Sequence, residues 1–194
     1  MARRRSSRPA IRSGSRTLLR LPAPSDRAAF GSLRAASARF LRPWEPRPAA
    51  DAPDPFDQLL ASRKDPRCAR LLLCRAEDGT LLGGVNANEI VGGIFQSAYL
   101  GYWIGAPHAG QGYMTEGFAL MLEHVFLDLG LHRVEANVQP TNAASLALVR
   151  RASFTREGYS PRYLKIAGRW SDHERWALLV DDWRRARRAR RTRS

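Results

Sequence analysis

Cysteine is scarce in this sequence: Cys68 and Cys74 are the only two among 194 residues. If both lie on the strand expected over residues 68–76, they are about 20 Å apart at about 3.3 Å per residue, which is too far for a disulfide. Neither their spacing nor their neighbours suit a metal ion, so no metal site is expected. A reduced, cytoplasmic protein is the class that fits best.

Long apolar runs and internal repeats are missing as well. No run of about 18 apolar residues is available for a membrane span. The basic start is followed by serine, arginine and glycine, where a secretory signal would have an apolar core. We therefore expect one domain, over residues 17–183, that buries most of its surface on folding and makes no membrane contact.

Acidic residues are absent from both ends of the chain. Residues 1–16 hold six arginines and residues 184–194 hold seven, in a chain whose formal net charge is +14. Without those thirteen arginines the chain has 19 basic and 18 acidic residues, so its middle is nearly neutral. We expect both ends to be disordered basic arms that attract polyanions such as RNA, and solvated tails without a partner are the alternative.

A glycine-rich turn between an apolar strand and a helix is the clearest feature that is present. The strand covers residues 99–104, and the helix begins within Ala109-Gly110-Gln111-Gly112-Tyr113-Met114. Because Gly110 and Gly112 carry no side chain, backbone N–H groups can turn toward one point, where the helix N-terminus adds free donors and the positive end of its dipole. This pattern predicts a pyrophosphate site, and a plain tight connection is the alternative.

The periodicity of the remaining chain predicts further strands and helices. Strands are expected over residues 17–21, 70–75, 81–88, 96–104, 132–139 and 176–180, and helices over 25–41, 56–64, 114–129 and 143–152. Five prolines between residues 43 and 55 exclude regular structure there, and Asn142 is expected to cap the last helix. This order indicates an α/β (α+β) fold, with a mixed sheet of about seven strands and helices on both faces.

The glycine turn is neither a Walker loop nor a dinucleotide-binding loop. No lysine followed by serine or threonine is present, and Thr115 stands where GxGxxG has its third glycine. Residues 109–114 instead resemble the acyl-CoA loop of the GCN5-related N-acetyltransferases (GNAT), which reads Gln/Arg-x-x-Gly-x-Gly/Ala. Gly112 keeps the central glycine, whereas Ala109 replaces the Gln or Arg and Met114 replaces the small last residue.

Motifs along the whole chain resemble the ribosomal-protein alanine N-acetyltransferases of the Rim type. They are Arg42-Pro43-Trp44-Glu45-Pro46, Gly101-Tyr102-Trp103-Ile104-Gly105, Met114-Thr115-Glu116, Leu131-His132-Arg133-Val134-Glu135-Ala136-Asn137-Val138, Pro140-x-Asn142-x-x-Ser145, Phe154-x-x-Glu157-Gly158-Tyr159, Gly168-Arg169-Trp170-x-Asp172-His173 and Asp182-Trp183. The resemblance covers about residues 17–183 and is closest to the RimJ-like branch. Ser153 departs from it, because the family usually has glycine at that position.

The resemblance implies an enzyme with acetyl-CoA as co-substrate, in which a neutral amine attacks the thioester directly. It also implies that the strand at 100–104 splays from its parallel neighbour at 132–138, and that the pantetheine arm pairs with the freed backbone groups. The residues that it assigns to the cofactor are Trp103, Ile104, Gly110, Gln111, Gly112, Tyr113, Met114, Thr115, Asn137, Asn142 and Ser145.

By the same resemblance, Ser145 lies near the sulfur and is the general acid that protonates the departing thiolate. A plain helix cap made by Asn142 and Ser145 is the alternative, and the two roles are compatible. Glu89 is the candidate base, acting directly or through water, against the reading of an exposed loop carboxylate. Glu135 is a second candidate, and a glutamate that some relatives use falls at Leu164 in this chain.

Two functions of different classes follow. The first is an acetyl-CoA-dependent N-acetyltransferase that acts on the N-terminal alanine of a ribosomal protein or on another amine, as a monomer or dimer. The second is a non-catalytic acyl-CoA-binding or RNA-associated module that has kept the fold. The departures at Ala109, Ser153 and Leu164 keep the second function open.

Overall fold

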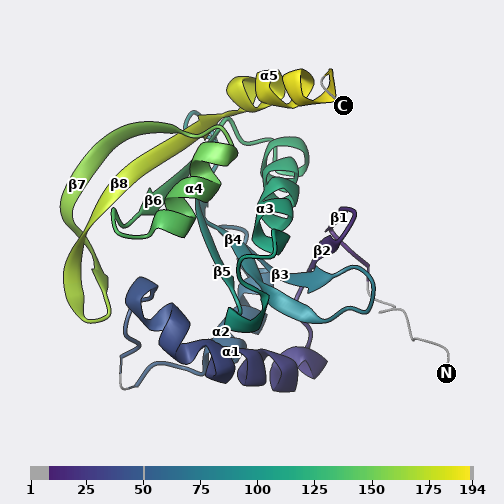
Figure 1. Ribbon diagram of the computed structural model, residues 1–194, viewed down its shortest axis with the longest axis vertical. Coiled ribbons are helices and arrows are strands. Elements are labelled where there is room, and N and C mark those ends of the chain that lie inside the picture. Colours follow the sequence, from purple (N-terminus) through teal and green to yellow (C-terminus); the bar gives the residue numbers. More distant parts are fainter. Residues whose placement is uncertain (1–8, 50, 193–194) are drawn as a thin grey trace.

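A mixed sheet of eight strands runs through the chain in the order β1-β2-β3-β4-β5-β6-β8-β7 (Figure 1). The structure is a computed structural model that describes residues 9–49 and 51–192. The strands are β1 (Arg12–Ser13), β2 (Thr17–Arg20), β3 (Ala69–Arg75), β4 (Leu81–Val91), β5 (Ser97–Ile104), β6 (Arg133–Val138), β7 (Thr155–Ile166) and β8 (Arg169–Leu179). All neighbouring strands are antiparallel except β5 and β6, which are parallel.

Five α-helices accompany the sheet. They are α1 (Arg27–Leu41), α2 (Pro55–Ala61), α3 (Tyr113–Glu123), α4 (Ala143–Arg151) and α5 (Val180–Arg191). Short 3-10 turns cover Pro24–Asp26, Arg42–Trp44, Ser62–Lys64 and Ala106–His108, and α3 continues as a π-helical turn over His124–Asp128. In the described part of the chain, no helix combines the length and the apolar character needed to cross a membrane.

Alternating side chains of the strands pack into two hydrophobic clusters, one on each face of the sheet. On β3, Leu71 and Leu73 belong to the main core, which α3 and α4 complete, whereas Leu72 and Cys74 belong to a second cluster that includes Phe56 of α2. Because successive strand residues point to opposite faces, helices cover both faces of the sheet. The predicted mixed sheet with helices on both faces is confirmed.

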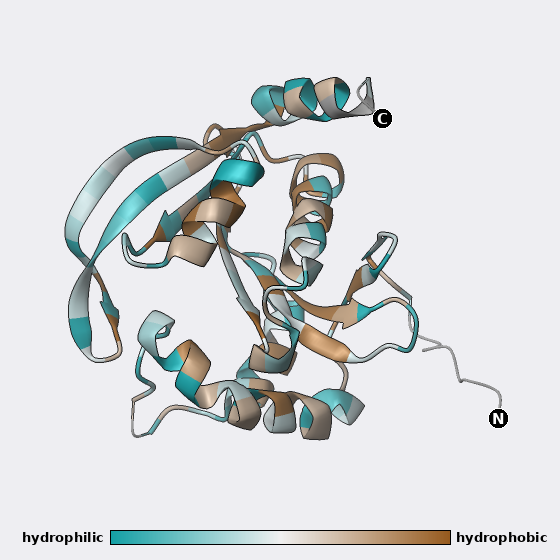
Figure 2. Cartoon of the chain, viewed as in Figure 1, coloured by the Kyte–Doolittle hydropathy of each residue, from teal (hydrophilic) through white to brown (hydrophobic). Residues whose placement is uncertain are grey.

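The sheet has one strand more than the expected seven, and the β7–β8 hairpin is where the sequence pattern was least informative. Nearly every side chain of β7 is exposed, on both faces of the strand. Figure 2 accordingly shows this hairpin in teal and white over most of its length. Without a buried face there is no alternation of apolar and polar residues to mark the strand.

The prediction of disordered arms is wrong for residues 9–16 and 184–191. The Ile11 N–H donates to the Leu19 carbonyl at 2.7 Å, β1 pairs with β2, and α5 continues to Arg191. The expected domain limits at residues 17 and 183 therefore do not match the folded part of the chain. Residues 1–8 and 193–194, which belong to the same expected arms, lie outside the described residues.

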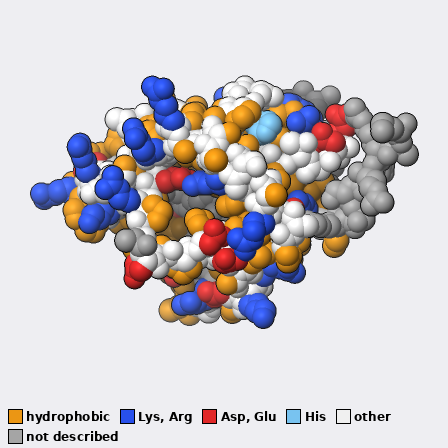
Figure 3. All heavy atoms as spheres, turned by 90° about the horizontal axis from the view of Figure 1, so that it is seen from below, with side chains coloured by type: hydrophobic (Ala, Val, Ile, Leu, Met, Phe, Trp, Pro, Cys, Tyr) orange, Lys and Arg blue, Asp and Glu red, His pale blue; other side chains and the backbone are white. Residues whose placement is uncertain are grey.

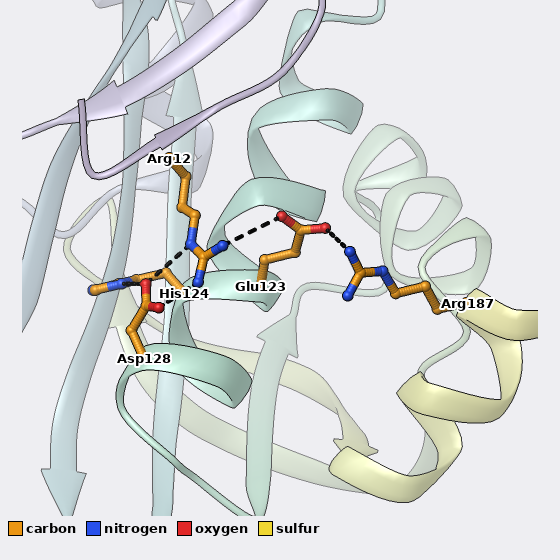
Figure 4. A network of polar contacts seen from close by, with 5 residues as sticks. All are labelled: Arg12, Glu123, His124, Asp128 and Arg187. Atoms are coloured by element: carbon orange, nitrogen blue, oxygen red, sulfur yellow. Dashed lines mark hydrogen bonds and ion pairs between the residues drawn. The ribbon is translucent and has the colours of Figure 1, made fainter.

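Acidic side chains of α3 and its π-helical turn hold both ends of the described chain (Figure 4). The Arg12 Nε donates to Asp128 at 3.0 Å, and the same guanidinium lies 3.9 Å from Glu123. The other carboxylate oxygen of Glu123 lies 2.8 Å from Arg187 of α5. Hydrogen bonds from Arg12 and His124 lower the pKa of Asp128. These pairs join segments far apart in the sequence, which is why composition alone misassigned the arms.

Ser153 generates a prediction about stability. It follows α4 with φ +69°, in the left-handed region that glycine adopts without a steric penalty. We expect Ser153→Gly to raise the free energy of unfolding by about 0.5–1 kcal/mol, measured by urea denaturation. The control is Ser160→Gly on β7. Ser160 has no positive φ, so this change should lower the free energy of unfolding by about 0.5–1 kcal/mol. Equal losses in both variants would contradict the assignment of strain to Ser153.

Candidate active site

A gap in the middle of the sheet separates β5 from β6. The two strands pair at three positions only, from Ser97 with Arg133 to Tyr99 with Glu135. Beyond them, residues 100–104 pair with β4 alone and residues 136–138 pair with β8 alone. Each strand therefore has backbone N–H and C=O groups on its inner side without a strand partner. The expected splay of these strands is confirmed.

A cavity of roughly 810 Å³ opens at this gap. It is bounded by the end of α1 and the turn after it, the end of β5, the glycine-rich loop and the start of α4. Eight of the predicted cofactor residues line it, namely Trp103, Ile104, Gly110, Gly112, Met114, Thr115, Asn142 and Ser145. Gln111 and Tyr113 belong to the loop but do not line the cavity, and neither does Asn137 of β6.

The glycine loop has the backbone conformation that the sequence predicted. Gly110 has φ +73° and Gly112 has φ +82°, both in the left-handed region, and no atom comes within 4 Å of a Cβ built on Gly110. The backbone angles, and not a lack of space, therefore require glycine at these positions. Gly112 directly precedes α3 and offers no side-chain cap, so the first N–H groups of α3 remain available as donors.

Two arginines that the sequence did not single out lie beside this loop. The Arg16 guanidinium lies 4.4 Å from the ring centre of Tyr113, and Arg151 of α4 donates to the Thr115 hydroxyl at 3.4 Å. Together with the open N-terminus of α3 they form a cationic setting that suits a phosphate. Arg16 had been assigned to the N-terminal arm, and only the fold brings Arg151 to the loop.

A second hollow, of roughly 510 Å³, continues from the loop between α3, α4 and α5. Thr115, Leu148 and Arg151 line both hollows, and Trp183 and Arg187 of α5 line the far side of the second one. The loop thus lies between two hollows. An elongated ligand with its phosphates near the middle would fit this arrangement.

Ser145, the expected general acid, is hydrogen-bonded to a second hydroxyl. Its Oγ lies 2.5 Å from the Tyr102 hydroxyl, and its N–H donates to the Asn142 side chain at 3.1 Å, which confirms the predicted cap. Burial raises the pKa of Tyr102 to about 12, and the bond to Ser145 opposes this only in part. Tyr102 therefore keeps its proton at neutral pH. The sequence analysis missed it, although it lies within the Gly-Tyr-Trp-Ile motif.

Asn137 carries an unsatisfied acceptor at the gap. Its Oδ1 is buried and has no hydrogen-bond partner in the described part of the chain. Its neighbours Ala136 and Val138 belong to the main core, so Asn137 points to the opposite face of β6. A buried acceptor without a partner costs free energy, and an amide N–H of a ligand in the gap would satisfy it.

A third hollow, of roughly 360 Å³, lies across Trp103 from the large cavity, and Trp103 and Glu45 line both. A Cβ built on Gly84 would lie 2.7 Å from the Trp103 Nε1, so this glycine lets the indole approach β4 closely. Arg34 lies 5.0 Å from the indole ring centre and donates two hydrogen bonds of 2.6 Å to Glu45. Trp103 therefore lies between two hollows, and the Glu45 side chain lines both of them.

Glu89, the predicted base, lies outside the lining of the three hollows. It is exposed and has φ +50°. It lies three residues along β4 from Asn86, the last residue of that strand that lines a hollow, which is about 10 Å at about 3.3 Å per residue, whereas a base must reach its proton directly or through one water. Glu135, the second candidate, also lines none of the three hollows, and Arg133 donates to it at 2.8 Å.

Comparison with known proteins relates this arrangement to acetyl transfer. The model of the acetyltransferase (GNAT) domain matches residues 16–155. The ribosomal protein uS5-alanine N-acetyltransferase of Escherichia coli is 32% identical over 188 residues, which are 92% of this chain and 96% of that protein. The probable N-acetyltransferase YjcK of Bacillus subtilis is 39% identical over 107 residues, only 55% of this chain and 59% of that protein. The solved structure of Mycobacterium smegmatis RimJ with CoA-disulfide has 30% identity and a TM-score of 0.79, and the match covers 86% and 83% of the two chains.

The glycine loop leads to a prediction about CoA binding. A valine at position 112 would have to adopt a φ of +82° and would place a β-branched side chain beside the phosphate site. We expect Gly112→Val to weaken CoA binding by about tenfold or more, measured by calorimetry. The control is Gly31→Val in α1, where no atom lies within 4 Å of the added Cβ and binding should not change. Unchanged affinity in a folded Gly112→Val protein would remove the loop from the site.

Proposed function

Because the chain belongs to the acetyltransferase (GNAT) family, and so is an acetyl-CoA-dependent N-acetyltransferase, we propose that its acceptor is the N-terminal amine of a protein. The acceptor that we favour is the N-terminal alanine of a ribosomal protein. The observation that carries the proposal is the pair of hollows that meet at Trp103, one suited to the cofactor and the other open to an amine. The Escherichia coli relative, which aligns over nearly its whole length, supports the choice of alanine.

Acetyl-CoA fits the residues present around the gap. Gly110, Gly112 and the free N–H groups of α3 would hold its pyrophosphate, with Arg16 and Arg151 on either side. The free backbone of β5 beyond Tyr99 and the unpaired Asn137 Oδ1 would receive the amide groups of the pantetheine arm. When bound, the cofactor supplies an activated acetyl group as a thioester.

The amine must lose a proton before it can attack. Glu45 is the acidic side chain that lines both hollows, so the acceptor ammonium can approach it from the amine side. Its two bonds from Arg34 fix its position and leave it an acceptor that passes the proton on through water. His108 also lines the large cavity, but it lies next to the loop expected to hold the pyrophosphate, away from the acceptor side.

Attack forms the carbon–nitrogen bond and breaks the carbon–sulfur bond. The Ser145 hydroxyl would give its proton to the leaving sulfur. The second proton, which the nitrogen loses as the amide forms, would restore the Ser145 hydroxyl directly or through Tyr102, which is protonated and lies 2.5 Å from it. The net products are an N-acetylated chain, CoA thiol and one released proton.

The proposal also includes contact with RNA. Ion pairs within the described part of the arms limit which arginines can make that contact. Arg12, Arg184, Arg185 and Arg187 each pair with an acidic residue of this chain. Arginines that are already paired have less to offer a phosphate backbone. The arms therefore lose part of the free positive charge that the sequence assigned to them.

A peptide panel tests the acceptor. We expect thiol release from acetyl-CoA with a short peptide that begins with alanine, and none with the same peptide carrying a blocked N-terminus. A lysine-containing blocked peptide and spermidine are the comparison amines. Turnover on either of these without turnover on the free alanine terminus would refute the proposed acceptor, while leaving the chain an acetyltransferase. Binding of acetyl-CoA without turnover on any amine would favour the non-catalytic module.

The two hydroxyls generate a kinetic prediction. We expect Ser145→Ala to lower kcat by about 10²-fold and Tyr102→Phe by about tenfold, with the affinity for acetyl-CoA nearly unchanged. If the two groups act as a unit, the double variant is no slower than Ser145→Ala alone. The control is Tyr163→Phe on the exposed strand β7, which should have wild-type kcat. Lower thermal stability with unchanged kcat in Ser145→Ala would leave Ser145 a helix cap only.

A further inference from the structure

Exposed cations surround the place where the β7–β8 turn meets the segment after α1. The Ala167 N–H of the turn donates to the Glu45 carbonyl at 2.9 Å, which joins the two elements. Lys165 and Arg169 are two residues from Ala167, and Arg42 and Arg47 are within three residues of Glu45. With Arg39 and Arg162, which flank the same two segments, these side chains form what we call the cationic rim: Arg39, Arg42, Arg47, Arg162, Lys165 and Arg169, all exposed.

Figure 3 shows this side of the molecule from below, with Lys and Arg side chains gathered at the left over apolar ones and beside a hollow. The left of that view corresponds to the β7–β8 hairpin and the C-terminal end of α1 in Figure 1. The cationic rim therefore borders the entrance on the side where Glu45 and Trp103 line the third hollow.

No side chain of the rim forms an ion pair within the described residues, although the charge of Arg162 contributes to the lowered pKa of Asp172. None of its six side chains lies within 4 Å of a carboxylate, whereas arginines elsewhere, such as Arg12, Arg20 and Arg133, are paired. The neighbouring acids have other partners. Glu45 binds Arg34, Glu174 binds Arg156, and Asp172 accepts from the Tyr159 hydroxyl and the Arg162 N–H, which leaves the exposed Asp51 as the nearby acid in sequence.

Aromatic rings lie exposed among these cations. Trp170 is 63% exposed and stands opposite Lys165 in the hairpin, and Tyr159 and Tyr163 are 47% and 36% exposed. A large exposed indole at a hairpin tip gains nothing for the core, and beside exposed cations it is available for contact with a partner. Flat rings beside cations are the combination by which proteins bind single-stranded nucleic acid, since bases stack on the rings and phosphates meet the charges.

The hairpin is built so that these side chains, and not its backbone, face a partner. Between Ser160 and Leu164 the register of β7 against β8 shifts, and Asp172 fixes the bulge through hydrogen bonds of 2.5 and 2.7 Å. A bulged edge strand is a poor template for pairing with another strand. Addition of a peptide strand to β7 is therefore disfavoured.

We propose that the cationic rim, together with Trp170, binds a single-stranded segment of RNA next to the acceptor entrance. The proposal deepens the proposed function and rests on it in one respect, because an acceptor N-terminus on a ribosomal particle lies among RNA strands. RNA held at the rim places the protein terminus at the hollow beside Glu45. The same charges repel small polycations from that entrance.

Charge neutralisation at the rim, compared with an equal change on α5, tests the proposal. The rim variant is Arg162→Ala with Lys165→Ala and Arg169→Ala in the full chain, and the matched control is Arg184→Ala with Arg185→Ala and Arg188→Ala. The probe is a labelled oligouridine of about 12 nucleotides, with anisotropy measured over a salt series. We expect the rim variant to lower the slope of log affinity against log salt by about 2, at about 0.7 per phosphate contact, and the α5 variant to leave it unchanged. A wild-type slope in the rim variant, or the loss in the α5 variant instead, would overturn the proposal.

Stacking is tested separately from charge. We expect Trp170→Ala to weaken oligouridine binding about tenfold at fixed salt without changing the salt slope, and Trp170→Phe to retain most of the affinity. Equal binding by Trp170→Ala and wild type, or binding of poly-glutamate as tight as that of the RNA, would show a surface for acidic polypeptides and overturn the assignment to RNA.

Acetylation of the short alanine peptide without RNA keeps the two proposals distinguishable. The rim variant should retain wild-type kcat and KM in that assay, because none of its three residues contacts the cofactor cavity or the third hollow. If neither the wild type nor the rim variant acetylates the peptide, the proposed acceptor is wrong. The RNA-binding measurements then still decide whether the rim binds RNA. A large loss of kcat in the rim variant alone would mean that these side chains serve the chemistry, and would overturn the proposal.

Discussion

The end of backbone pairing between β5 and β6 after Tyr99 is the constraint on which the site depends. Two strands that part in the middle of a sheet leave polar backbone groups that must find partners. Each strand is held on its outer side, β5 by β4 and β6 by β8, so neither can close the gap by moving toward the other. The fold therefore maintains an open row of donors and acceptors, and a cofactor with amide groups along its length can bind with little demand on particular side chains.

Local signals in the sequence identified the parts of the site that depend on local geometry. The glycines at 110 and 112, the helix beginning at Tyr113 and the cap by Asn142 each follow from a few neighbouring residues, and the structure has them as expected. The parts that were missed depend on contacts between distant segments. Arg16 reaches the loop through the β1–β2 turn, and Tyr102 meets Ser145 only because α4 packs on the face of the sheet to which Tyr102 points.

The errors have equally physical causes. Glu89 was chosen because it precedes the central strands, but a residue on a strand rises by about 3.3 Å per position, and Glu89 lies three positions beyond Asn86, the last residue of β4 that lines a hollow. The arms were judged by composition. Composition does not reveal that Arg12 pairs with Glu123 and Asp128, which lie on a helix more than a hundred residues later in the chain. The strand predicted over residues 176–180 matches the buried end of β8, whereas β7 was missed because a strand exposed on both faces has no period.

Glu123 has a consequence for both ends of the described chain. Arg12 and Arg187 reach opposite oxygens of its carboxylate, so the first and last elements of the described chain end on one turn of α3. One side chain of α3 thus attaches both the first strand and the last helix to the domain. Loss of the Glu123 carboxylate would therefore loosen two segments from opposite parts of the sequence at the same time.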